Sequence, residues 1–231
     1  MKAHSWILLS AGLVASGAAG AQSLKGVAFA GGSVGEGVSA YAGAVTSLPG
    51  SSLGNGLAIR GSVNGGRYRY SGGPGRVRAK YVGAEAALVY QMSGSWGWAN
   101  VSAGPRFTDI SLSPADPANK RQGTRVDAAV QTDGGYGLEN WRLGWIGSLG
   151  IIDRAYQGRL QLGRLVSSAS QTRLGVEAGV HGDPYFTTVT AGAFAGARLG
   201  NNLEAQLSAG ISEQAGRGAK PYVSLGFSQL F

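Results

Sequence analysis

The feature that most constrains the fold is a period-two alternation of apolar and polar residues along nearly the whole chain. From Lys25 onward, segments of about ten residues alternate in this way and are separated by Gly, Ser, Asn, Asp and Pro. The clearest segment, residues 81–92, has Val82, Leu88 and Met92 on one face and Glu85 and Gln91 on the other. Helical spacing of apolar residues is absent beyond chance. The pattern predicts an all-β chain whose strands have one apolar face.

The strands of a soluble β-sandwich also alternate between apolar and polar residues. Three further observations indicate that the apolar faces of this chain contact lipid rather than a protein core. Charges stand in the middle of the polar faces, and the last segment alternates up to Phe231. Aromatic residues gather toward segment ends, at Tyr68, Tyr70, Trp96, Trp98, Trp141, Trp145, Tyr156 and Tyr222. These features are typical of outer-membrane barrels, which are apolar outside, polar inside and belted by aromatics. Since hydrocarbon offers no water to an open sheet edge, the sequence predicts a closed antiparallel transmembrane β-barrel.

About twelve strands are predicted. They are residues 25–34, 36–47, 57–70, 76–92, 96–107, 123–132, 138–151, 155–166, 172–181, 186–199, 202–212 and 219–231. An even number puts both ends of the barrel chain in the periplasm. The longest connector, 108–123, then lies outside, and the connector 48–56 lies on the periplasmic side. A change of phase at Gly65 and Gly66 predicts a β-bulge in the third strand.

The N-terminal segment predicts export. Lys2 and His4 precede an apolar run at residues 6–19, which ends in the small residues 19–21. This run is shorter than the ~20 residues of a spanning helix, and its ending is typical of a cleavage site. We therefore expect a signal peptide at residues 1–21 and a barrel at residues 22–231, located in the outer membrane of a Gram-negative bacterium.

Composition excludes several kinds of site. The chain has no Cys, so disulfides and thiolate metal sites are excluded. The net charge of +8 comes from 20 Lys and Arg against 12 Asp and Glu, and these residues are dispersed rather than gathered in a nucleic-acid-binding module. We predict no metal site, no cofactor and no nucleic-acid partner.

The inward faces are predicted to carry a network of charges. Its members are Arg60, Glu85, Arg125, Asp127, Arg142, Arg159, Arg173, Glu177, Arg198 and Glu204. Two interpretations are open. In the first, Arg–carboxylate pairs fill a narrow barrel, because buried charges must be paired and small barrels tend to be filled by side chains. In the second, the polar lining forms a conduit. The first interpretation is favoured, because a barrel of about twelve strands has a narrow interior that side chains can fill.

His181 is the one His that remains after signal cleavage, and it precedes Gly182 and Asp183 in a predicted outer loop. A lipid hydrolase on the outside of the barrel would need Ser, His and an acid within hydrogen-bond reach. No Ser or acid stands at a telling spacing from His181. The sequence therefore predicts a turn-capping His and no catalytic residue.

Two stretches resemble a known family. Residues 104–130 carry Gly104, a Pro-x-Asp-Pro motif at 114–117 and Gly123, and residues 174–199 carry Glu177 and Phe194 among spaced Gly residues. Together with the Gly-Arg-Tyr-Arg-Tyr of 66–70, this order resembles the cellulose biosynthesis protein BcsS family from about residue 41 to the end. The resemblance implies an exported barrel associated with bacterial cellulose production, with no catalytic role that transfers to a residue of this chain.

This resemblance implies an accessory protein that supports export or surface anchoring of the polymer. Expected partners are outer-membrane lipid, the barrel-assembly machinery, and cellulose or other cellulose-synthase components. Because cellulose is neutral, aromatic platforms are the expected glycan contacts, at Tyr68, Tyr70, Tyr156 and Tyr185. The residues expected to close the barrel are Val223, Leu225, Phe227 and Phe231. Two alternatives stay open, an outer-membrane lipid hydrolase and a small diffusion pore.

Overall fold

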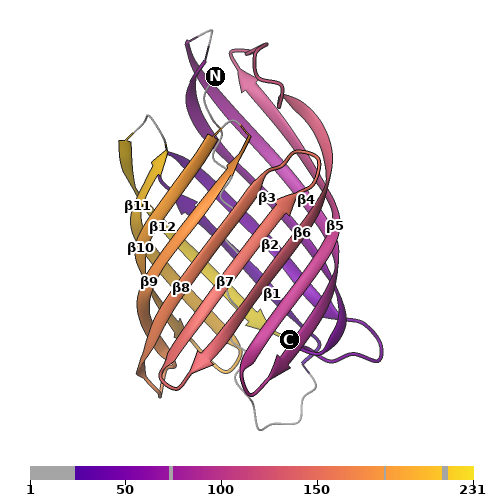
Figure 1. The fold of residues 1–231 in the computed structure, drawn as a ribbon, viewed down its shortest axis with the longest axis vertical. Helices are drawn as coiled ribbons and strands as arrows, with labels where there is room; N and C mark the ends of the chain where they lie inside the picture. The colour runs from indigo at the N-terminus through magenta and orange to yellow at the C-terminus, as the bar shows by residue number, and fades with distance from the viewer. Residues whose placement is uncertain (1–23, 73–74, 185, 215–217) are drawn as a thin grey trace.

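The computed structural model describes residues 24–72, 75–184, 186–214 and 218–231, which form a closed antiparallel barrel (Figure 1). Its strands are β1 (Gly26–Val34), β2 (Gly37–Ser47), β3 (Gly56–Gly72), β4 (Gly75–Gly94), β5 (Gly97–Ser113), β6 (Gly123–Leu138), β7 (Trp141–Gly150), β8 (Tyr156–Ser167), β9 (Thr172–Asp183), β10 (Phe186–Arg198), β11 (Leu203–Gln214) and β12 (Gly218–Leu230). The predicted fold class and strand number are confirmed. The predicted signal peptide and Tyr185 lie outside the described residues.

No helix within the described ranges is long and apolar enough to cross a membrane.

The barrel is closed by the pairing of its first and last strands. In this antiparallel pair, Val27 lies opposite Leu230 and Val34 opposite Val223. The backbone of Phe231 continues the ladder: its carbonyl accepts from the amide of Lys25 at 2.7 Å, and its amide donates to the carbonyl of Gly26 at 3.0 Å. The sheet therefore has no open edge, which is the condition for a sheet surrounded by hydrocarbon.

The side chains alternate between outside and lumen as the sequence predicts. On β4, Val82 and Leu88 are 58% and 53% exposed, whereas Gln91 is 3% exposed. The outward faces of the other strands are also apolar, and they include the four residues expected to close the barrel, Val223, Leu225, Phe227 and Phe231. An apolar belt outside and buried polar groups inside are the arrangement that lipid requires.

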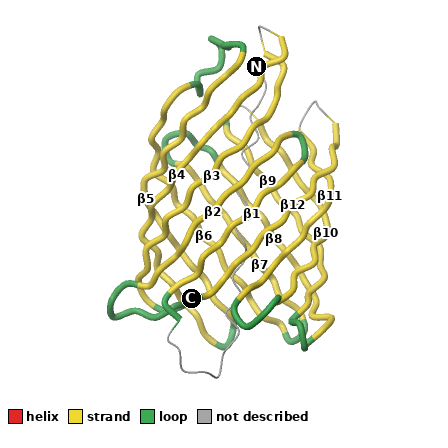
Figure 2. Tube along the Cα trace, turned by 180° about the vertical axis from the view of Figure 1, so that it is seen from behind, coloured by secondary structure: helices red, strands yellow, loops and turns green. Residues whose placement is uncertain are grey.

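The two ends of the barrel differ in height. Figures 1 and 2 show β3, β4 and β5 rising above the other strands at the end opposite the C terminus, here called the upper end. We call residues 66–72, 75–81 and 109–113 the projecting sheet. Its inward face holds a cluster of Tyr68, Tyr70, Val77, Ala79, Tyr81 and Ile110. This apolar contact lets the three strands continue beyond the height of their neighbours.

The projecting sheet corrects two predictions. The predicted outer connector 108–123 is shorter than expected, because β5 continues to Ser113 along β4. The predicted bulge at Gly65 and Gly66 is wrong, since β3 pairs without a shift with both neighbours. The apparent change of phase arises because polarity inverts above the apolar belt: Arg67 and its outward neighbours are charged, while the inward residues are aromatic.

Gly66 is explained by close approach instead of a bulge. A Cβ on this residue would lie 2.5 Å from the carbonyl oxygen of Val38 and 2.8 Å from the ring of Tyr81. The lack of a side chain therefore allows the Tyr81 ring to approach the backbone of β3 closely. A register shift occurs at a different place, between Leu165 and Ser167 in the pairing of β8 with β9.

The predicted aromatic belt is only partly present. Tyr90, Trp96, Tyr136 and Trp141 are exposed on the outside near the lower end. Tyr68, Tyr70 and Trp98 are buried instead, because their positions in the alternation point inward. Tyr222 also points inward, where its hydroxyl bonds to Glu177. Proximity to a strand end does not tell which face a ring occupies; the parity of the strand does.

A charge on the outward face should reveal the surrounding lipid. Val176→Arg, near the middle of β9, is expected to lower the free energy of unfolding by about 2–4 kcal/mol in a bilayer, whereas the same change at a membrane boundary costs ~0–1 kcal/mol. Val34→Arg, at the upper end of β1, is the matched control. Denaturant titration in lipid vesicles measures both losses, and equal losses would show that lipid does not cover this face.

Candidate functional site

The charged lumen of the barrel is the candidate site, and its first group is centred on Glu85. Arg60 Nη2 donates to Glu85 Oε1 at 2.6 Å, and Arg106 Nη2 lies 2.7 Å from Glu85 Oε2. Asp133 lies 3.9 Å from Arg60 and accepts a hydrogen bond from Asn100 at 2.9 Å. Two guanidinium groups thus face two carboxylates, so this wall of the lumen is neutral and rigidly held.

The second group gathers four donors around Glu177 on β9. The carboxylate pairs with Arg159 and accepts hydrogen bonds from Gln161 at 2.8 Å, Ser208 at 3.0 Å and Tyr222 at 2.6 Å. Because β10 and β11 separate β9 from β12 in the barrel, the bond from Tyr222 reaches past two strands. Four hydrogen-bonding partners satisfy a buried carboxylate fully, which is what a low-dielectric interior demands.

A glycine opposite Glu177 makes room for this arrangement. Gly192 on β10 is the register partner of Glu177. A Cβ on Gly192 would lie 2.6 Å from the hydroxyl oxygen of Tyr222. Any larger residue would push the Tyr222 hydroxyl away from the carboxylate.

The third group lies at the lower end and is unbalanced. Arg198 lies 3.8 Å from Glu204, and Arg142 and Arg173 line the same cavity as that carboxylate. Nη1 of Arg142 is buried without a hydrogen-bond partner in the described part of the protein. Among the described residues, three guanidinium groups thus lie near one carboxylate, unlike the groups at Glu85 and Glu177.

The upper mouth is crossed by the β5–β6 loop, residues 114–122. On one side, the Tyr70 hydroxyl donates to Asp116 at 2.9 Å and accepts from Asn119 at 2.8 Å. On the other side, Arg121 forms a buried ion pair with Asp183 on β9. The loop is thus tied to β3 and to β9, and Asp116 and Arg121 are buried inside the mouth.

The ten predicted lumen charges all point inward, and the structure sorts them into these groups. Arg60 joins Glu85, Arg159 joins Glu177, and Arg142, Arg173 and Arg198 gather near Glu204. The remaining two are engaged near the upper end: Arg125 pairs with Asp153, and Asp127 accepts the amide of Ile152 at 2.7 Å.

Sequence reasoning missed several members of these groups. They are Arg106, Asp116, Arg121, Asp133 and Asp183. Arg106 and Asp133 follow the inward parity of β5 and β6, so the alternation could have found them. Arg121 and Asp116 belong to a loop, where no periodicity indicates direction.

Among the described residues, three cavities inside the barrel are small. One near the upper end and one near the lower end each measure about 80 Å³, and a third beneath the loop measures about 50 Å³. A ligand pocket usually measures ~300–1,000 Å³, whereas a buried water needs ~10–15 Å³. These cavities therefore have room for waters and not for a glycan chain.

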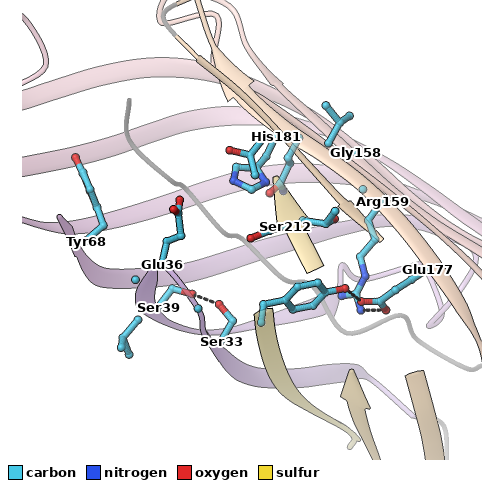
Figure 3. A pocket seen from close by; sticks show the side chains of 18 of the residues that line it. Ser33, Glu36, Ser39, Tyr68, Gly158, Arg159, Glu177, His181 and Ser212 are labelled. Carbon is cyan, nitrogen blue, oxygen red and sulfur yellow. Dashed lines mark hydrogen bonds and ion pairs between the residues drawn. The ribbon is translucent and has the colours of Figure 1, made fainter. Parts of the chain in front are cut away.

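The Glu177 group separates the upper cavity from the lower one. Glu177 and Arg159 line the upper cavity, and Gln161, which bonds to Glu177, lines the lower one. Figure 3 shows Tyr68 on one side of the upper cavity and the paired Arg159 and Glu177 on the other. The side chains of the Glu177 group thus lie between the two cavities.

His181 also lines the upper cavity (Figure 3). It does not border an outer loop, as the sequence predicts, because β9 continues to Asp183, and it is 8% exposed inside the barrel. A lipid hydrolase with its site on the outside needs a catalytic His that faces lipid. The position of His181 does not provide one.

The predicted rim aromatics are dispersed. Tyr68 and Tyr70 are 5% and 4% exposed inside the projecting sheet, so their rings are covered and cannot stack on a glycan in this conformation. Tyr156 lies at the upper end of β8, partly exposed, with its hydroxyl bonded to Thr187. Among the described residues, no group of three or more His, Asp or Glu side chains is arranged to hold a metal ion.

Solved structures that resemble the chain are outer-membrane barrels. The KdgM porin matches with a TM-score of 0.50 at 10% identity, covering 89% of this chain and 99% of the porin. The translocator domain of autotransporter NalP from Neisseria meningitidis matches at 0.51 and 16% identity, covering 92% and 90%. A deletion mutant of the TodX monoaromatic hydrocarbon channel matches at 0.54 and 9% identity, covering 90% and 91%. At these identities the likeness shows the fold alone.

Comparison with curated proteins finds no significant match. A sequence model of one family, described as cellulose biosynthesis protein BcsS, matches residues 27–231. The match extends from β1 to Phe231 and so takes in all twelve strands, beginning further toward the N terminus than the expected start near residue 41. The chain therefore belongs to the cellulose biosynthesis protein BcsS family.

Proposed function

We propose that the protein is a non-enzymatic outer-membrane barrel that anchors cellulose, or the machinery that produces it, at the cell surface. The observation that carries this proposal is the filled lumen. A conduit for a glucan chain needs a continuous opening, whereas the two cavities on either side of the Glu177 group measure about 80 Å³ each. Family membership supports the connection with cellulose.

The proposed orientation puts the lower end, where β1 begins and β12 ends, in the periplasm and the projecting sheet outside. Long extracellular and short periplasmic connections are typical of outer-membrane barrels. Outer-membrane lipid then covers the apolar belt, and the barrel-assembly machinery is the expected partner of the last strand. Cellulose or a cellulose-synthase component would meet the protein at one of the two mouths.

The first test separates anchoring from export. In a strain that lacks the gene, anchoring predicts that total cellulose stays near the wild-type amount while the fraction retained on the cells falls. Loss of a conduit would instead stop polymer from reaching the medium. Dye binding to washed cells, together with the sugar content of the medium, measures the two fractions. Unchanged total and retained cellulose would contradict the proposal.

The filled lumen predicts a silent barrel. In planar bilayers, the wild-type protein is expected to give no resolved single-channel steps, because paired side chains occupy the lumen. Regular steps with the conductance of a water-filled pore would favour the diffusion-pore alternative over anchoring. Arg164→Gln, an exposed outward position on β8, is a control that should leave the recording unchanged.

The Glu177 group is expected to stabilise the barrel. Glu177→Gln keeps the shape of the side chain but leaves Arg159 without its carboxylate, and breaking a buried pair in this way costs about 3–5 kcal/mol. Glu213→Gln, on the exposed outward face of β11, removes the same charge and should change stability by no more than about 0.5 kcal/mol. Chemical unfolding in detergent micelles measures both, and similar values would show that the network is not structural.

A further inference from the structure

The outward face of the projecting sheet is strongly basic. Every outward side chain on this part of β3 and β4 that carries a charge is a cation, and all are exposed: Arg67, Arg69, Arg76, Arg78 and Lys80. We call these residues the basic face. Within the described residues, none of them forms an ion pair.

The register sets these cations directly against one another. Arg67 lies opposite Lys80, and Arg69 lies opposite Arg78. Like charges at facing positions of an antiparallel pair destabilise it. Asp109 on β5 is outward too, but it lies opposite Val82 and accepts a hydrogen bond from Thr124 at 2.8 Å. The repulsion within the hairpin is thus left for an external anion to relieve.

The height of the basic face matches a layer of lipid headgroups. The outward residues of β4 are apolar from Val82 to Met92, and ten residues at ~3.4 Å, tilted by ~40°, rise about 25 Å, the height of the apolar band of an outer-membrane barrel. Lys80 and Arg78 follow about 5 Å and 10 Å above that band. Headgroups occupy roughly this depth on each side of the hydrocarbon core.

The basic face also borders a groove large enough for a headgroup. This groove measures about 870 Å³ and lies along the edge of the projecting sheet. Its lining includes the five cations, Lys220, Glu36, and Tyr68 and Tyr70 from the inward cluster. Glu36 is the one acid among the described lining residues and lies 3.6 Å from Lys220, so no described carboxylate pairs with the basic face. Behind it, the buried Tyr68–Ile110 cluster and the bonds from Tyr70 to the loop hold the strands in place.

We propose that the basic face is a binding site for the phosphate groups of an outer-leaflet glycolipid of the lipid A type. Arginine suits this ligand because its planar guanidinium binds phosphate oxygens in pairs. The site rests on the membrane orientation in the proposed function and adds a ligand to it. Phosphate bound at this height would neutralise the facing cations and fix the projecting sheet relative to the membrane surface.

The experiment compares the wild-type barrel with Arg69→Gln combined with Arg78→Gln, in phosphatidylcholine vesicles with and without bisphosphorylated lipid A. The control combines Arg154→Gln with Arg164→Gln, which removes the same charge from exposed positions elsewhere. Each cation near an anionic surface contributes about 1 kcal/mol, or a factor of about five in affinity. The double variant should therefore bind lipid A about 25-fold more weakly, and the control should match the wild type.

Thermal unfolding gives a second readout, because the arginines are expected to raise the unfolding temperature when lipid A is present and not when it is absent. Lipid A should raise the unfolding temperature of the wild type and of the control but not that of the Gln variant. In phosphatidylcholine alone, the Gln variant should be at least as stable as the wild type, because a like-charge pair is gone. A variant that is less stable there would show that the arginines serve the fold, and would overturn the proposal. Arg69→Lys combined with Arg78→Lys keeps the charge and should retain most of the lipid A effect.

Two further arms identify the source of the phosphate. Lipid A without phosphates should change the unfolding temperature of the wild type, the control and the Gln variant by the same amount. Inorganic phosphate at the same concentration should hardly change the unfolding temperature of the wild type. Equal stabilisation by inorganic phosphate would overturn a lipid site. Cellulose retention by cells that carry the Gln variant tests the proposed function separately: retention at the wild-type level together with unaltered lipid A binding would refute the lipid site and leave anchoring intact.

Discussion

The structure depends on the hydrogen bonds that join β1 to β12. In hydrocarbon an unpaired backbone amide or carbonyl costs several kcal/mol, so a sheet that spans a membrane is stable only when it has no edge. The pairing of residues 27–34 with 223–230 removes that edge, and the backbone bonds of Phe231 extend it to the last residue. Closure in turn creates an enclosed space, and the contents of that space decide what the barrel can do.

A narrow closed barrel with polar inward faces has to satisfy its charges internally. At Glu85 and Glu177, carboxylates and guanidinium groups from separate strands meet, and the remaining lone pairs are taken by Ser, Gln and Tyr donors. This arrangement leaves cavities of about 80 Å³ on either side of the Glu177 group and holds the surrounding strands together. A rigid, filled barrel with a basic rim suits a protein that holds a position in the membrane, and this property links the proposed anchoring role to the proposed lipid site.

Much of the fold can be predicted because the alternation of a strand is local. The parity of β4 puts Val82 and Leu88 outside and Glu85 inside, and the same reasoning puts Arg159 and Glu177 in the lumen. The errors at the upper end of β3 share one cause. Above the apolar belt the alternation reverses, so the aromatic Tyr68 turns inward and the charged Arg67 outward, and this reversal resembles a bulge at Gly65 and Gly66.

The face that each strand residue occupies follows from the sequence alone, since period two and the polarity of neighbouring residues choose between lipid and lumen. Which charges meet depends on the closed barrel. Tyr222 reaches Glu177 from three strands away, and Arg121 reaches Asp183 from a loop that carries no periodicity. The height of β3, β4 and β5 above the other strands is likewise a property of the tertiary structure, because it depends on how the strands pack against one another once the barrel has closed.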